Sequence, residues 1–186
     1  MNHPIARRTF IAGGIAASIC GMTYSEDTAA LPQQRKYVFR ALSAQQAANL
    51  NRLGEAMVPG SSRHGLAHYV DYQLANPAEK SMLMVKYLNI SQPYHEFYRS
   101  GLRASDALAL RRFRRPIVAL DDSQALTLIR AIANETLQGW DGPPPPLFFF
   151  ALKADAVDVT YGTAAGFKSL GVPYMAHIEP PTPWGE

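Results

Sequence analysis

Between its proline and glycine residues, the chain repeats apolar side chains at the three- and four-residue spacing of amphipathic helices. The first repeat follows Ser43 and Gln46, which have the spacing of a capping box, and it stops at Pro59. A second strong repeat starts at Asp121. The pattern therefore predicts a mostly α-helical protein with a single small domain.

Shorter apolar repeats predict further helices. These are expected over residues 66–74, 76–88, 93–102, 105–115 and 147–160. The prolines at 143–146 predict a stiff extended run ahead of the last of these helices. From Tyr161 onwards, glycine and proline interrupt every regular pattern, so we expect a long irregular C-terminal tail rich in proline, glycine and aromatic residues.

The first thirty residues have the layout of an export signal. Arg7 and Arg8, with Phe10 two places on, precede an uncharged run of small and apolar residues that leads to a small-residue stretch ending at Ala30. The paired arginines favour the twin-arginine route, which exports folded proteins to the periplasm, and an ordinary secretory leader is the alternative. We therefore expect a leader over 1–30 and a helical domain over 31–186.

Cys20 is the only cysteine, and it lies within the leader. The helical domain therefore has no disulfide, no thiol nucleophile and no cysteine metal ligand. A lipid anchor on Cys20 is a weaker alternative, because Ile19 stands where lipoprotein signals have a small residue. The net charge of +3 is too small to indicate a nucleic-acid partner, and none is expected.

His64, His68 and Asp71 share one face if residues 63–74 form a helix. Two imidazoles and a carboxylate so arranged can hold a divalent metal ion. A His-Glu-x-x-His protease would have its glutamate where this chain has Gly65. The alternatives are a polar helix face or a stand-alone periplasmic protein that binds a metal or a small ligand through this trio.

The other acid-base candidates are the pairs His95-Glu96 and His177-Glu179. Neither pair belongs to a recognisable nucleophile motif. The chain has no Gly-x-Ser-x-Gly elbow and no Gly-x-Gly-x-x-Gly turn. We therefore predict no catalytic and no cofactor-binding residues in this chain.

A basic cluster surrounds Phe113. Its members are Arg111, Arg112, Arg114 and Arg115. One interpretation is a solvated helix end, because cations stabilise the C-terminal end of a helix dipole. The other is a docking patch for an acidic protein surface or for anionic lipid headgroups.

Aromatic residues continue into the C-terminal region among prolines and glycines, without helical periodicity. Stiff aromatic segments lose little entropy on docking and serve as interface anchors. The alternative is a tail that completes the core of its own helices. The predicted partner contacts are Phe149, Tyr161, Phe167, Tyr174, His177 and Trp184.

Six segments occur in a recognisable order along the chain. They lie at 53–60, 70–75, 161–163, 166–168, 170–174 and 180–184. Together with the paired arginines of the leader, they resemble the gluconate 2-dehydrogenase subunit 3 family over most of the domain. One departure is Thr163-Ala164-Ala165, where many members have a glycine- and asparagine-rich stretch, so the resemblance does not carry gluconate over as the substrate.

The resemblance implies a non-catalytic small subunit of a periplasmic dehydrogenase complex, peripheral to the inner membrane. The implied partners are a large FAD-dependent subunit of the glucose-methanol-choline type, a cytochrome subunit with haem c, and the twin-arginine translocon. No cofactor is implied on this chain. The small subunit would help the flavoprotein mature and carry it, already folded, through the translocon.

Overall fold

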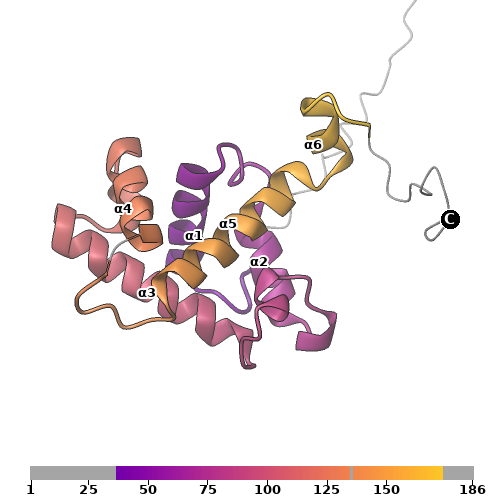
Figure 1. Ribbon diagram of the computed structural model, residues 1–186. Coiled ribbons are helices and arrows are strands. Elements are labelled where there is room, and N and C mark those ends of the chain that lie inside the picture. Colours follow the sequence, from indigo (N-terminus) through magenta and orange to yellow (C-terminus); the bar gives the residue numbers. More distant parts are fainter. Residues whose placement is uncertain (1–36, 135, 174–186) are drawn as a thin grey trace, which may run out of the picture. The chain divides into compact units, whose positions relative to one another are not determined.

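The computed structural model describes residues 37–134 and 136–173, and it confirms the predicted mostly helical fold. Within these ranges every regular element is a helix (Figure 1). The α-helices are α1 (Ala44–Met57), α2 (Leu66–Ala75), α3 (Tyr94–Phe113), α4 (Asp122–Asn134), α5 (Pro145–Tyr161) and α6 (Ala164–Ser169). The short 3-10 helices are η1 (Ala78–Lys80), η2 (Met84–Tyr87) and η3 (Ile117–Ala119).

Helix α1 begins and ends where the sequence predicts. Ser43 Oγ accepts the backbone N–H of Gln46 at 3.1 Å, and Gln46 Oε1 accepts the backbone N–H of Ser43 at 2.9 Å. This reciprocal pair is the predicted capping box. The apolar stripe of the helix, with Leu50 and Leu53 fully buried, packs against α2, α4 and α5.

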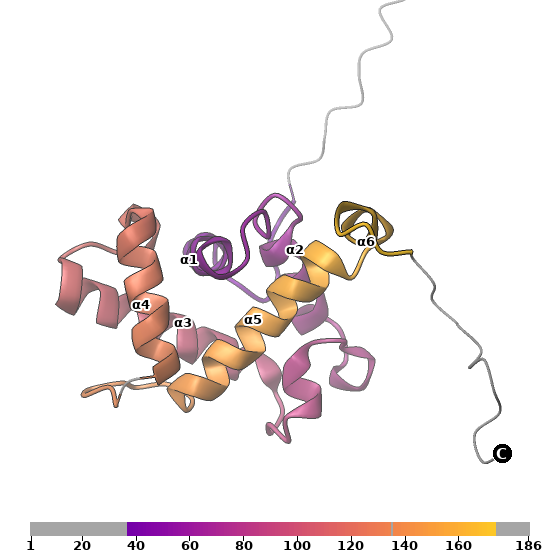
Figure 2. The ribbon, with the colours of Figure 1, turned by 45° about the horizontal axis from the view of Figure 1, so that its top comes forward.

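Helix α5 lies at the centre of the arrangement. It packs against α1, α2, α3 and α4, and Figure 2 shows it running diagonally across the other helices. The helix starts at Pro145, a position where a missing backbone N–H costs no helical hydrogen bond. The predicted extended run is therefore wrong for Pro145 and Pro146, which belong to the first turn of α5.

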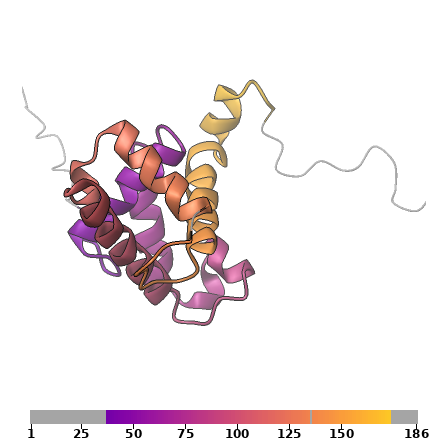
Figure 3. The same ribbon diagram turned by 60° about the vertical axis from the view of Figure 1, so that its left-hand side comes forward.

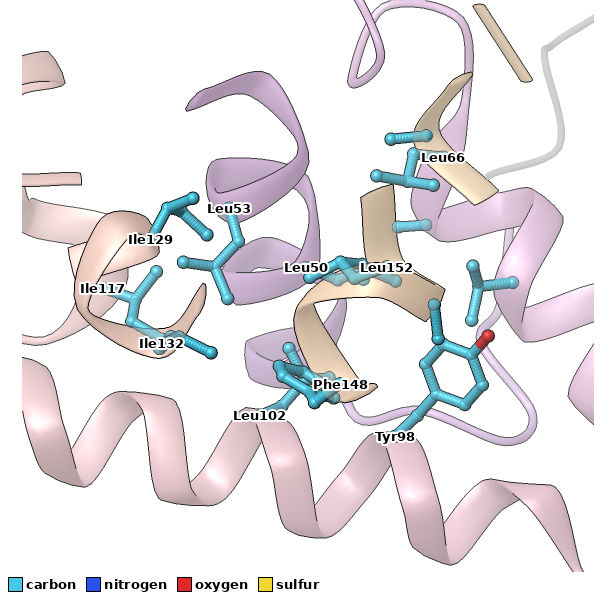
Figure 4. Close-up of a cluster of buried hydrophobic side chains, with 14 of the residues drawn as sticks. Leu50, Leu53, Leu66, Tyr98, Leu102, Ile117, Ile129, Ile132, Phe148 and Leu152 are labelled. Carbon is cyan, nitrogen blue, oxygen red and sulfur yellow. The ribbon is translucent and has the colours of Figure 1, made fainter. Parts of the chain in front are cut away.

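One hydrophobic core joins these helices, and Figure 4 shows side chains from α1 to α5 meeting in it. Phe148 of α5 is buried in this core over α3. A Cβ atom at Gly101 of α3 would lie 2.3 Å from the Phe148 ring. Only glycine therefore admits the ring at this crossing, because packed interiors leave no room for the displaced atoms.

The predicted helix over 76–88 is wrong, because two short 3-10 helices, η1 and η2, occupy this stretch. Side chains from other elements bind its backbone: Gln73 Oε1 accepts the N–H of Met82 at 2.9 Å, and Asp155 Oδ1 accepts that of Met84 at 3.0 Å. These bonds replace the ones that an α-helix would make. As a result Met82 is 65% exposed, although its spacing predicts burial.

The helices predicted separately over 93–102 and 105–115 form one continuous helix, α3. Ser105 is fully buried in the middle of α3, and its hydroxyl donates to the carbonyl of Gly101 at 2.7 Å. The hydroxyl is therefore satisfied inside the helix, where it does not act as the cap of a new one. The helix ends at Phe113.

A six-residue helix, α6, lies inside the region predicted to be irregular from Tyr161. Thr163 caps it, since its Oγ1 accepts the backbone N–H of Gly166 at 3.0 Å. Figure 3 shows α6 beyond the C-terminal end of α5, against which it packs. Local capping thus makes a helix that composition alone does not predict.

Candidate functional site

The three consecutive phenylalanines at the start of α5 point in different directions. Successive residues of a helix are about 100° apart around its axis. Phe148 is buried in the core, Phe150 is 50% exposed, and Phe149 is half-buried between them. Of the three, Phe149 combines fixed packing with an accessible ring edge, which is what a contact residue requires.

Phe149 lines an apolar groove between α1, α4 and α5, with a volume of about 210 Å³. The other lining residues are Ala56, Met57, Leu126, Ile129, Arg130, Ala133, Asn134 and Lys153. The ammonium group of Lys153 lies 5.7 Å from the centroid of the Phe149 ring, within cation–π range. The structure therefore gives this predicted contact residue a hollow surface with cations at its rim.

Two other predicted contact residues, Tyr161 and Phe167, do not line the groove at Phe149. Tyr161 is half-buried against the core at the far end of α5, and Phe167 is half-buried on α6. Phe149 and Tyr161 are separated by about 18 Å along the helix at 1.5 Å per residue. Tyr174, His177 and Trp184 lie outside the described residues, as does the predicted leader with its two arginines.

A second groove, which sequence reasoning missed, lies at the C-terminal end of α5. Its volume is about 440 Å³, and it is lined by Tyr69, Met82, Asp158, Val159, Gly162 and Thr163. Burial raises the pKa of Asp158 above its usual value. No local sequence pattern marks this groove, because Met82 reaches it only through the irregular stretch between η1 and η2.

The structure does not bring the candidate metal trio onto one helix face. Helix α2 begins at Leu66, as the helix predicted over 66–74 does, so residues 63–65 are not part of it and His64 lies ahead of the helix. Gly65, between His64 and Leu66, has a left-handed backbone conformation with φ 86°. His68 lies against aromatic rings, with its centroid 4.6 Å from that of Tyr37.

Asp71, the third member of that trio, is fully buried and already has four donors. The Tyr37 hydroxyl donates to it at 2.8 Å, and so do the backbone N–H groups of Arg40, Ala41 and Leu42 at 3.0, 2.8 and 2.8 Å. Burial tends to raise the pKa of this carboxyl, but the hydrogen bonds outweigh burial and hold it below its usual range. Asp71 therefore fastens residues 37–42 onto α2. In the described part of the chain, no three His, Cys, Asp or Glu residues are placed to hold a metal ion.

Asp155 on α5 is a second buried carboxyl, and sequence reasoning missed it. The Tyr98 hydroxyl donates to Oδ2, and the backbone N–H of Met84 donates to Oδ1 at 3.0 Å. Burial raises the pKa of Asp155 to about 7, although both hydrogen bonds act to lower it. A signal was present in the sequence, because Asp155 stands seven residues after Phe148 on the apolar face of the predicted helix.

The pair His95-Glu96 lies at the surface in the first turn of α3. His95 Nε2 is 3.2 Å from Glu96 Oε1, and an Arg99 nitrogen is 3.8 Å from the same oxygen. This arrangement is a surface ion-pair cluster. The Ser100 hydroxyl donates to the backbone carbonyl of Glu96 at 2.5 Å, and in the described ranges no hydroxyl or thiol is hydrogen-bonded to the two side chains themselves. His177 and Glu179 fall outside those ranges.

None of the described helices combines the length and the apolar character that crossing a bilayer demands.

A comparison with known protein families identifies the family of this chain. A family model described as gluconate 2-dehydrogenase subunit 3 matches residues 44–177, from the first residue of α1 through every described helix. Comparisons with curated proteins and with solved structures find no match. The family model spans well over half of the sequence and agrees with the resemblance in the motifs. The chain belongs to the gluconate 2-dehydrogenase subunit 3 family, which indicates an accessory subunit that associates with the other subunits of such a complex.

Proposed function

We propose that this chain is the non-catalytic small subunit of a membrane-associated, FAD-dependent dehydrogenase of the glucose-methanol-choline type. FAD resides in the large subunit, and haem c resides in a cytochrome subunit that takes up the electrons. The small subunit stabilises the folded flavoprotein and escorts it through twin-arginine export to the periplasm. The observation that carries this proposal is the family match over residues 44–177.

The buried polar groups support a structural role for the domain. Asp71 and Asp155 are both engaged by groups of their own chain, and each fixes a segment outside the α-helices, residues 37–42 and the start of η2 respectively. Their hydrogen bonds are those of a scaffold that holds its loops in place. A scaffold of this kind suits a subunit whose role is to present a surface to a partner.

The groove at Phe149 is the first surface that we assign to the flavoprotein. A half-buried aromatic ring with cations at its rim has the features of an interface hot spot. Tyr161, Phe167, Tyr174, His177 and Trp184 extend the proposed interface towards the C-terminus. The leader, through Arg7, Arg8 and Phe10, provides the export signal for both proteins if the flavoprotein has no signal of its own.

Co-purification tests the interface. The chain is co-expressed with an affinity-tagged flavoprotein of the glucose-methanol-choline type from the same source, and the amount of the chain retained on the tag is measured. Phe149→Ala should weaken the complex at least tenfold, since hot-spot truncations cost about 2 kcal/mol or more. Phe150→Ala is the matched control, because it removes the same ring one residue away and outside the groove.

Two results would count against this assignment. Equal retention of the Phe149→Ala and Phe150→Ala variants would remove the groove from the interface. Failure of the wild-type chain to bind any flavin-containing dehydrogenase, combined with turnover by the purified chain alone, would remove the accessory role itself.

The C-terminal residues give a second test of the interface. Removing residues 174–186 deletes none of the six α-helices in the described ranges, so we expect helix content by circular dichroism to stay close to that of wild type. The complex should weaken more than the fold does. If thermal unfolding shifts strongly while binding is unchanged, the tail completes the core of its own helices.

A further inference from the structure

The basic turn at the end of α3 comprises Arg111, Arg112, Arg114 and Arg115 around Phe113. All four guanidinium-bearing residues are exposed, whereas Phe113 is half-buried against the core. Figure 1 shows this end of α3 at the left-hand edge of the helical unit, and Figure 2 agrees. The turn therefore presents concentrated positive charge at an outer edge of the described structure.

The backbone of the basic turn is held in place. Arg114 takes the left-handed conformation at φ 56°, and its N–H donates to the carbonyl of Leu110 at 3.1 Å. Just beyond it, the N–H of Ile117 donates to Asp106 Oδ1 at 2.8 Å. The ring of Phe113 packs against the hydrophobic core and so fixes the turn to the domain. A binding surface that is already ordered loses little entropy when a ligand arrives.

Three of the four arginines, Arg111, Arg114 and Arg115, have no acidic neighbour at ion-pair distance in the described part of the chain. The ion pairs in those ranges, with nitrogen–oxygen distances of up to 4.0 Å, involve other cations. Arg111 donates only to the carbonyl of Gln138, at 3.3 Å. Asp106 Oδ1 accepts the backbone N–H of Ile117, just beyond the turn. Three guanidinium groups thus remain available to an external anion.

The composition of the turn favours a lipid surface over a protein surface. Stable protein interfaces centre on exposed aromatic or apolar anchors. Here Phe113 faces the core, and Leu110, 45% exposed, is the apolar neighbour within α3. The arginines also point in several directions, because Arg111 and Arg112 are about 100° apart on the helix and Arg114 ends the helix in the left-handed conformation. Headgroups that move laterally can pair with each of them, whereas a rigid acidic patch must match all of them at once.

We infer that the basic turn binds the anionic phospholipid surface of a bilayer through pairing of its guanidinium groups with lipid phosphates. Arginine suits this role because its planar guanidinium group can donate two parallel hydrogen bonds to the oxygens of one phosphate. Each cation near an anionic membrane increases affinity roughly fivefold. The contact would be made by this chain itself, so it does not depend on the proposed dehydrogenase partner.

Vesicle flotation tests the inference. The full chain is mixed with vesicles of phosphatidylcholine containing 30 mol% phosphatidylglycerol (about a third of the lipid) or with phosphatidylcholine alone, at low salt. Wild type should float only with the anionic vesicles and should be released at about 0.5 M salt, where screening shortens to a few ångströms. The variant R111Q/R114Q/R115Q should lose roughly 100-fold in affinity, at about fivefold per cation.

A matched variant tests whether vesicle binding depends on the arginines of the turn or only on the net charge of the chain. R63Q/K80Q/K168Q removes three exposed charges from other places, and it should lose less than about tenfold. Every variant keeps the same leader, so any contribution from Arg7 and Arg8 is constant. Circular dichroism should show unchanged helix content in both triple variants.

Four outcomes would overturn the inference. These are equal losses in the two triple variants, equal binding to neutral vesicles, no binding to anionic vesicles at low salt, or a turn variant that keeps vesicle binding but loses its protein partner. The last outcome would assign the turn to an acidic protein surface. Selective loss in the turn variant, with salt-sensitive binding of wild type, supports the lipid contact.

Discussion

Asp71 and Asp155 are both fully buried in helices of the same domain, yet their pKa values move in opposite directions. Burial raises the pKa of either carboxyl, because an apolar interior disfavours the charged form. Asp71 accepts four hydrogen bonds, three of them from consecutive backbone N–H groups. Asp155 accepts two.

The two carboxyls differ in the number of donors and also in their surroundings, because Asp71 lies beside the exposed residues Tyr37 and Arg40, whereas Asp155 faces the fully buried Tyr98. At Asp71 the donors outweigh burial, so the carboxylate stays ionised and fixes residues 37–42. At Asp155 burial outweighs the donors, and the group titrates at about pH 7 while it fixes the start of η2. The same type of side chain thus serves as an ionised anchor on α2 and as a titrating anchor on α5.

Removing Asp71, the carboxylate with more donors, should have the largest effect on the free energy of unfolding. Asp71→Ala leaves three backbone N–H groups without an acceptor, two of them buried, and it should lower the free energy of unfolding by about 5 kcal/mol at pH 7. Asp71→Asn keeps one acceptor and should cost about half as much. Urea denaturation measures both. A loss below about 1 kcal/mol in the alanine variant would mean that residues 37–42 are not held by this carboxylate.

The pH dependence of stability should reveal Asp155. Its folded pKa of about 7 lies above the ordinary 3.8, so the folded state binds more protons between these values. Stability should therefore fall as pH rises from about 4 to about 7, by roughly 4 kcal/mol at 1.4 kcal/mol per pH unit, and then level off. Asp155→Asn should remove this slope. Asp71 acts in the opposite sense, since its contribution is present above 3.8 and is lost as pH falls through its lowered pKa.

A slope that persists in Asp155→Asn would show that another group carries the pH dependence. Urea midpoints at pH 5 and pH 8 are sufficient to distinguish the two cases. The control is Asp121→Asn, an exposed carboxyl at the start of α4, which should leave the slope unchanged.

Matched removal of one hydroxyl at each site gives the smaller effects. Tyr98→Phe takes away one of two donors from Asp155, so it should raise the pKa of that carboxyl further and cost about 1.5 kcal/mol. Tyr37→Phe takes away one of four donors at a partly exposed position, and it should cost about 0.5 kcal/mol while Asp71 stays ionised at pH 7. Carboxyl titration by NMR, with urea denaturation, checks the pair. A larger loss of stability in Tyr37→Phe than in Tyr98→Phe would contradict the proposed difference between the two carboxyls.

The sequence predicts the parts of this fold that depend on local signals. The capping box of Ser43 and Gln46 marks the start of α1, and its apolar stripe is buried as expected. The start of α4 is equally local, because Asp121 Oδ1 accepts the N–H of Gln124 at 2.9 Å. The order of short motifs was specific enough to indicate the family that the comparison confirms.

The parts that could not be predicted depend on distant partners. The donors to Asp71 lie 29 to 34 residues earlier, and those to Asp155 lie 57 and 71 residues earlier. Helical spacing alone cannot separate a metal-binding face at His64, His68 and Asp71 from a face that binds the chain's own backbone. The same long-range bonds explain why residues 76–88 do not form the predicted helix.

The export of the flavoprotein tests the central claim most directly. In the variant R7K/R8K the leader keeps its positive charge, which an ordinary secretory signal tolerates, but it loses the paired arginines. If the chain escorts its partner, the flavoprotein and its dehydrogenase activity should accumulate in the cytoplasm, and the periplasmic fraction should lose both. Normal periplasmic activity of the flavoprotein in this variant would contradict the escort role.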